Sequence, residues 1–167
     1  MSHPPMSYLS QAELELALDL ARVLHEASEE VRVLSLGAGG SGGRAGDAAL
    51  AVRHWTGPHR DTFEQLHADE QASAVTARNR LVEEADAWAR FWADATEARQ
   101  DRLHDEAMSD HRRATTDYQR EFDAWNEAIA NDPSSSIYLT APVRPRPPTP
   151  PPSVVVPTAA GGYRPTI

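Results

Sequence analysis

The sequence contains no cysteine and no lysine, and its apolar residues occur only in short runs. Without cysteine, the chain has no disulfide framework and no thiolate zinc site. All 16 basic residues are arginines, which are dispersed among 25 acidic residues to give a net charge of −9. Nucleic-acid binding needs a clustered positive face, so we expect no nucleic-acid partner. The lack of a long apolar run excludes a membrane-spanning helix, and we expect no N-terminal signal peptide.

Proline is scarce in the first 130 residues and concentrated afterwards. Ten of the 13 prolines lie between Pro133 and Pro165. Such a segment buries little apolar surface to offset its chain entropy, so we predict that residues 132–167 form a disordered proline-rich tail. Arg144, Pro147 and Pro150 match an Arg-x-x-Pro-x-x-Pro pattern for polyproline recognition, although a solvated tail is favoured because proline-dense segments produce this match by chance.

Residues 1–9 are expected to form a short N-terminal tail, and a helix is predicted over residues 10–35. Ser10 and Glu13 fit a capping box, and Leu9 and Leu14 occupy the two positions of a hydrophobic staple. The apolar residues that follow recur every three or four positions, which is the helical period. They are Leu14, Ala17, Leu20, Leu24, Ala27, Val31 and Leu34.

A glycine-rich connector at residues 37–46 is expected to end this helix, because glycine costs about 1 kcal/mol relative to alanine in a helix interior. Its first part, Gly37 to Gly42, imitates the Gly-x-Gly-x-x-Gly loop of dinucleotide-binding enzymes. That loop functions at the edge of a parallel sheet, and the sequence offers no further strands to build one. A flexible connector is therefore the preferred interpretation, with a dinucleotide-binding enzyme as a remote alternative.

A second, much longer helix is predicted from Pro58 to about Asn131. Gly57 is acceptable immediately before a helix, and proline is favoured at the first helical position. The segment up to Asn131 contains no further proline and no glycine. The segment is interpreted as nearly continuous helix, and its thin apolar stripe makes the stretch near Ser109 and Asp110 the expected place for any single break or bend. Whether residues 103–131 form a separate third helix is left open by the sequence.

Aromatic residues mark two parts of the long helix. Trp88 and Trp92 are expected to anchor the packing against the first helix. Tyr118, Phe122, Trp125 and Ile129 continue the helical spacing beyond the reach of that helix. We predict that these four residues fold back as a third helix, pair with a second copy, or contact another protein, because an exposed aromatic stripe is unusual on a solvated helix.

No arrangement of residues indicates chemistry. The seven histidines include His104 and His111 on one helical face, but there is no His-Glu-x-x-His motif. No nucleophile elbow or phosphate loop with lysine is found either. We therefore expect no catalytic, cofactor-binding or metal site, and no enzymatic activity.

The segment Trp55-Thr56-Gly57, placed between two predicted helices, resembles the Trp-x-Gly (WXG) family of small type VII secretion proteins. The aromatic that often follows the tryptophan by eight residues has a counterpart in Phe63. The resemblance covers roughly residues 10–100 and implies an antiparallel helical hairpin whose turn is shaped by Trp55, Gly57 and Phe63. The strict Tyr-x-x-x-Asp/Glu export signal is absent, since Tyr118 is followed at the fourth position by Phe122. In the family, a dimer partner can supply this signal.

The sequence thus predicts an all-α protein with a hairpin domain over residues 10–131. The leading hypothesis is a non-enzymatic interaction protein that resembles a type VII secretion substrate or its partner. It would act by helix packing, as a homodimer or with a second small helical WXG-like protein. The resemblance implies a cytoplasmic location before export and a secreted or cell-envelope location afterwards. The alternative is a cytosolic helical adaptor unrelated to secretion.

Overall fold

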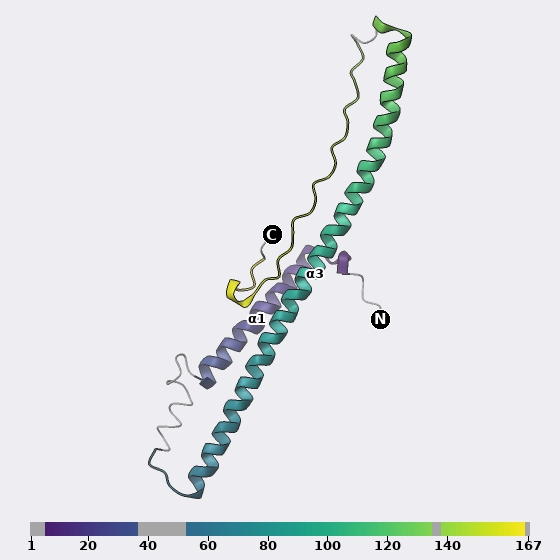
Figure 1. The fold of residues 1–167 in the computed structure, drawn as a ribbon. Helices are drawn as coiled ribbons and strands as arrows, with labels where there is room; N and C mark the ends of the chain where they lie inside the picture. The colour runs from purple at the N-terminus through teal and green to yellow at the C-terminus, as the bar shows by residue number, and fades with distance from the viewer. Residues whose placement is uncertain (1–5, 37–52, 135–137, 166–167) are drawn as a thin grey trace, which may run out of the picture. The chain divides into compact units, whose positions relative to one another are not determined.

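In the part of the chain that the structure describes, the fold is built from two α-helices of very different length. The computed structural model describes residues 6–36, 53–134 and 138–165. Helix α1 spans Gln11–Leu36 and helix α3 spans Pro58–Asn131, while two short 3-10 helices, η1 at Met6–Tyr8 and η3 at Ala159–Gly161, flank them (Figure 1). No β-strand occurs within the described ranges. The predicted all-α class with an extended second helix is therefore confirmed.

The chain divides into two compact units, and α3 contributes to both. The hairpin unit consists of Leu9–Ala95 and Val154–Ile167. The distal unit consists of Met1–Tyr8 and Thr96–Ser153.

Helix α1 begins with the expected cap. The Ser10 backbone N–H donates to the Glu13 carboxylate at 2.7 Å, and the Glu13 N–H donates to the Ser10 hydroxyl at 3.3 Å. The first of these bonds is the main reason that the pKa of Glu13 lies below its ordinary value. Leu14 is fully buried and Leu9 packs against the same core. The capping box and the hydrophobic staple are thus both present.

Helix α3 begins at Pro58, as the sequence indicates. Gly57 has a φ of +87° and its carbonyl accepts a hydrogen bond from the Arg60 N–H at 3.0 Å. Residues with a Cβ rarely adopt this conformation, so glycine is the residue that lets the chain turn directly into the proline. Asp61 lies in the first turn, where the helix dipole favours a negative charge.

The break predicted near Ser109 and Asp110 is wrong, because α3 is one uninterrupted helix from Pro58 to Asn131. A thin apolar stripe weakens packing, but it does not remove a backbone hydrogen bond as proline would. Ion pairs one turn apart also occur in this region. Asp110 contacts Arg113 at 3.4 Å and Arg102 contacts Glu106 at 2.8 Å. Exposed pairs of this kind each add only a few tenths of a kcal/mol, roughly, to a helix that nothing interrupts.

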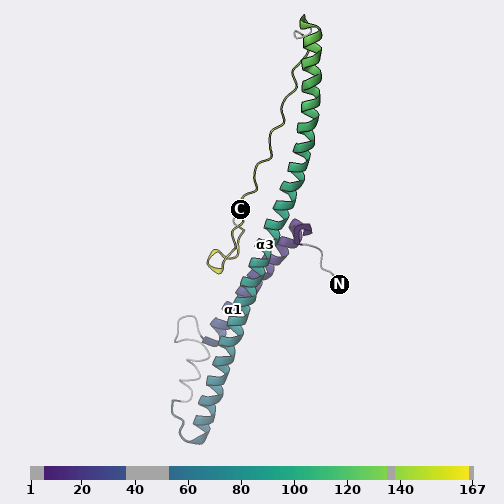
Figure 2. The same ribbon diagram turned by 45° about the vertical axis from the view of Figure 1, so that its right-hand side comes forward.

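The core of the hairpin unit lies between α1 and the first half of α3, which run side by side in opposite directions (Figures 1 and 2). Glu29 of α1 contacts Arg78 of α3 at 3.9 Å. Most core positions are alanines, which let the helices approach closely, and Trp92 is the largest buried side chain among them. The buried core residues are Leu14, Ala17, Leu18, Ala21, Ala85, Ala89, Trp92, Ala93, Ala95 and Tyr163.

The presence of Tyr163 in this core was not anticipated. The sequence predicted disorder for residues 132–167, and disorder of that segment as a whole stays a prediction. Within it, the structure places η3 and Tyr163 against the helices, with Val154 and Ala159 packed on the same cluster. The end of the proline-rich segment therefore supplies apolar surface to the hairpin, which the interpretation as a solvated tail did not include.

Candidate functional site

The turn motif comes together as a small aromatic cluster at the start of α3. The rings of Trp55 and Phe63 meet edge to face with centroids 5.7 Å apart, and Phe63 stacks on His67 at 6.0 Å. The Trp55 carbonyl also accepts a bond from the Arg60 guanidinium at 3.4 Å. Phe63, eight positions after the tryptophan, lies beside the Trp55 ring. Trp55, Gly57 and Phe63 thus form one local unit.

Trp55 lies beyond the reach of α1, so it does not close the hairpin by packing on both helices. Glu29 lies opposite Arg78, so Leu36, two turns later on α1, lies opposite the part of α3 near Gln71. Phe63 is about 12 Å further along α3 at 1.5 Å per residue. Trp55 therefore packs on α3, and 48% of its surface is exposed. The physical reason is the early end of α1. The glycine-rich connector at 37–46 lies outside the described residues.

The two tryptophans assigned to the hairpin interface lie where the helices meet. Trp92 is 2% exposed and belongs to the core. Trp88 is half-buried against that core and meets Phe91 edge to face, with ring centroids 5.6 Å apart. The four-residue spacing of Trp88 and Trp92 was enough to predict that they share one face of the helix, because positions four apart are neighbours on a helix surface.

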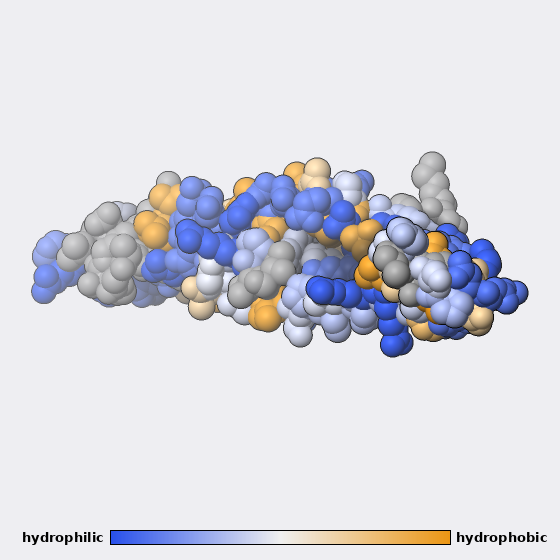
Figure 3. All heavy atoms as spheres, turned by 90° about the horizontal axis from the view of Figure 1, so that it is seen from above, coloured by the Kyte–Doolittle hydropathy of each residue, from blue (hydrophilic) through white to orange (hydrophobic). Residues whose placement is uncertain are grey.

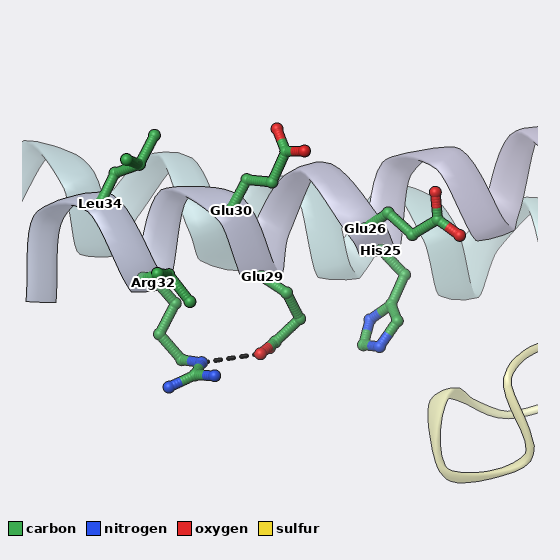
Figure 4. A pocket seen from close by; sticks show the side chains of 7 residues that line it. His25, Glu26, Glu29, Glu30, Arg32 and Leu34 are labelled. Atoms are coloured by element: carbon green, nitrogen blue, oxygen red, sulfur yellow. Dashed lines mark hydrogen bonds and ion pairs between the residues drawn. The ribbon is translucent and has the colours of Figure 1, made fainter. Parts of the chain in front are cut away.

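Helix α1 carries a second apolar stripe on the side away from this core. Successive residues of a helix are rotated by about 100°, so the side chains of this second stripe point away from Leu14 and Leu18. They are Leu16 at 68%, Leu20 at 37%, Val23 at 58% and Leu34 at 64% exposure. The space-filling view shows hydrophobic residues interrupting a mostly hydrophilic surface in several places (Figure 3). Leu16, Leu20 and Val23 lie within about two turns on one face of α1. Leu34 lies about three turns further along, beyond the exposed Glu30, which projects from the same side as Leu34 (Figure 4). These aliphatic side chains leave apolar surface in water.

The four apolar residues of distal α3 are all half-buried within the distal unit. Tyr118 stacks on Phe122 with centroids 5.7 Å apart, and Phe122 stacks on Trp125 at 5.9 Å. The Trp125 indole N–H donates to the carbonyl of Leu139 at 3.4 Å. A third helix over 103–131 is excluded by the continuity of α3, and pairing of Tyr118, Phe122, Trp125 and Ile129 with another chain stays a prediction.

Tyr163 fixes the C-terminal segment to the hairpin. Its hydroxyl donates to the Asp86 carboxylate at 2.8 Å, and its ring meets the edge of His25 at 5.6 Å. Gly162 adopts a left-handed conformation with φ +63°, and Tyr163 follows with φ +50°. Burial is the main reason that the pKa of Tyr163 rises to about 12, and the bond to Asp86 adds to it. The signal that sequence analysis missed was a single large aromatic placed directly after two glycines.

One hollow lies along the second half of α1, and its lining does not converge on a common point. Glu29 holds Arg32 at 2.7 Å, whereas the carboxylates of Glu26 and Glu30 project from another side of the helix (Figure 4). Clusters of three or more potential metal ligands are not found in the part of the chain that the structure describes. The parallel sheet required by the dinucleotide-binding interpretation is likewise not found there, and Gly37 to Gly42 lie outside it.

Neither described α-helix has a stretch long and apolar enough to cross a bilayer. Comparison of the chain with protein-family models, with curated proteins and with solved structures found no match.

Proposed function

We propose that this chain is a non-enzymatic helical interaction protein that acts by packing the outer face of α1 against another helical hairpin. The observation that carries the proposal is the exposed stripe of Leu16, Leu20, Val23 and Leu34. A two-helix hairpin has one packed interface and leaves its other faces in water. A second hairpin placed on this stripe would complete a four-helix arrangement, in which apolar stripes face a common centre.

The partner is a second copy of this chain or another small helical hairpin. Support for a relationship to the WXG secretion proteins comes from the turn motif, in which Gly57 has positive φ and Trp55 lies on Phe63. The antiparallel hairpin and its tryptophan-marked turn are what the resemblance implies. Export through a type VII system, and with it a cytoplasmic location before secretion, belongs to the same proposal.

The packing proposal is tested by measuring the mass of the full chain in solution with size-exclusion chromatography and light scattering. We expect a dimer that Leu16→Glu combined with Val23→Glu converts to a monomer without loss of helical circular dichroism. Leu66→Glu is the matched control, because Leu66 is 64% exposed on α3 outside the stripe. A monomer that also forms no complex with a co-expressed Trp-x-Gly protein would contradict the proposal.

Export is tested separately, in a host with a working type VII system. We expect the chain in the culture medium, and we expect its loss from the medium when the secretion ATPase is deleted. Recovery from the cytosol alone would favour the alternative function, a helical adaptor unrelated to secretion.

A further inference from the structure

The proline-rich chain of the distal unit has a regular relationship to α3. Residues 139–153 run beside the distal part of α3 in both ribbon views (Figures 1 and 2). Half-buried positions recur there at every third residue: Pro142, Pro145, Pro148 and Pro151. Three residues per turn is the period of a polyproline II helix, and proline fixes the φ that this helix requires. One edge of the segment therefore lies against α3, starting where Trp125 donates to the carbonyl of Leu139.

The other two edges of the segment face solvent. Arg144, Pro147 and Pro150 are all exposed, and they share one edge because they are three apart. The second free edge carries Val143, which is 87% exposed, and Arg146. The residues of the Arg-x-x-Pro-x-x-Pro pattern are thus not distributed over all edges of the polyproline II segment. The three defining residues lie on one side, away from the edge that α3 occupies.

The charge of this segment also differs from that of the rest of the chain. Residues 138–153 contain Arg144 and Arg146 and no acidic residue, whereas the whole chain has a net charge of −9. Two arginines are too few to make the multiple phosphate contacts of nucleic-acid binding. They suit a protein groove with carboxylates at one end, since a guanidinium and a carboxylate form paired, charge-assisted hydrogen bonds.

We propose that the exposed edges of residues 143–150 form a docking ligand for an aromatic-lined polyproline-binding domain of the SH3 type with an acidic end to its groove. Such domains recognise preformed polyproline II helices. Helix α3 holds the third edge, so the ligand is already extended before binding and loses less conformational entropy. The proposal is independent of the role of the α1 stripe.

The test uses the full chain and a purified SH3 domain that accepts Arg-x-x-Pro-x-x-Pro ligands, with binding measured by calorimetry. We expect saturable binding that weakens at least about tenfold in Arg144→Glu and in Pro147→Ala combined with Pro150→Ala, which is about 1.4 kcal/mol. Pro145→Ala combined with Pro148→Ala, on the edge facing α3, should weaken binding less. Arg164→Glu is the charge control and should leave binding unchanged.

A synthetic peptide of residues 138–153 separates docking from presentation. We expect the full chain to bind several-fold more tightly than the peptide, because α3 organises the segment. Absence of binding by the full chain, or equal losses from the two proline pairs, would overturn the proposal. Equal affinity of peptide and full chain would overturn the role given to α3. Circular dichroism of each variant confirms that α3 remains helical.

Discussion

Removing the Tyr163 hydroxyl tests whether the C-terminal segment is a structural part of the hairpin. Tyr163→Phe keeps the buried ring and deletes the donor that reaches Asp86 at 2.8 Å. Hydrogen bonds to charged groups contribute about 1.5–3 kcal/mol, and the lower end applies because Asp86 is only half-buried and can rehydrate. We therefore expect unfolding to become easier by about 1.5 kcal/mol, which lowers the melting temperature by a few degrees in a chain of this size.

The pH dependence of stability provides a second and more specific readout. Burial holds the pKa of Tyr163 at about 12, above the ordinary value of 10 for tyrosine. A raised acid pKa stabilises the folded state fully below pH 10, and this stabilisation is lost as the pH rises from 10 to 12. This difference between the two pKa values corresponds to roughly 2–3 kcal/mol of folding stability. The chain contains no lysine, so no lysine titration overlaps this window.

The assay is urea unfolding followed by circular dichroism at pH 7 and at intervals from pH 9 to 11.5. We expect the native chain to lose stability through this range and Tyr163→Phe to lose much less. Tyr138→Phe is the matched control, because Tyr138 is 84% exposed. Equal stability of Tyr163→Phe and the native chain, with superimposable pH profiles, would refute the docking of this segment as a contribution to folding.

Three further substitutions test the helix ends and the core. Gly57→Ala should destabilise the start of α3 by about 1–2 kcal/mol, because alanine is strained at φ +87°. Thermal melting should show this loss of stability. Gly161→Ala is the control and should cost less, because Gly161 has no positive φ. Trp92→Ala should cost about 3–5 kcal/mol by leaving a cavity between α1 and α3, and a urea midpoint within error of the native value would contradict the core described here. Ser10→Ala should cost about 1 kcal/mol by removing the cap of α1. We expect increased hydrogen exchange confined to the first turn of α1. Unchanged protection of that turn would show that the capping box adds nothing to stability.

The helix boundaries could be read from the chain because their causes are local. Ser10 with Glu13 and Gly57 with Pro58 each act within a few residues of the backbone groups that they satisfy, so pattern and cap chemistry identify α1 and the start of α3. The contact of Trp55 with Phe63 is also local, but it was the resemblance to Trp-x-Gly proteins that grouped these two residues at the turn. The break expected near Ser109 failed because a thin apolar stripe indicates weak packing, not a missing backbone hydrogen bond.

The remaining features depend on which segments meet in space. Tyr163 and Asp86 are 77 positions apart, and no periodicity in either segment reports their contact. The position of Trp55 beyond the end of α1 follows from the register of the two helices, which the Glu29–Arg78 contact reveals and the spacing of residues does not. Likewise, the sequence contained the spacing of Arg144, Pro147 and Pro150, but only packing against α3 decided which edge of that segment faces water. Long-range contacts select among arrangements that local chemistry leaves equally open.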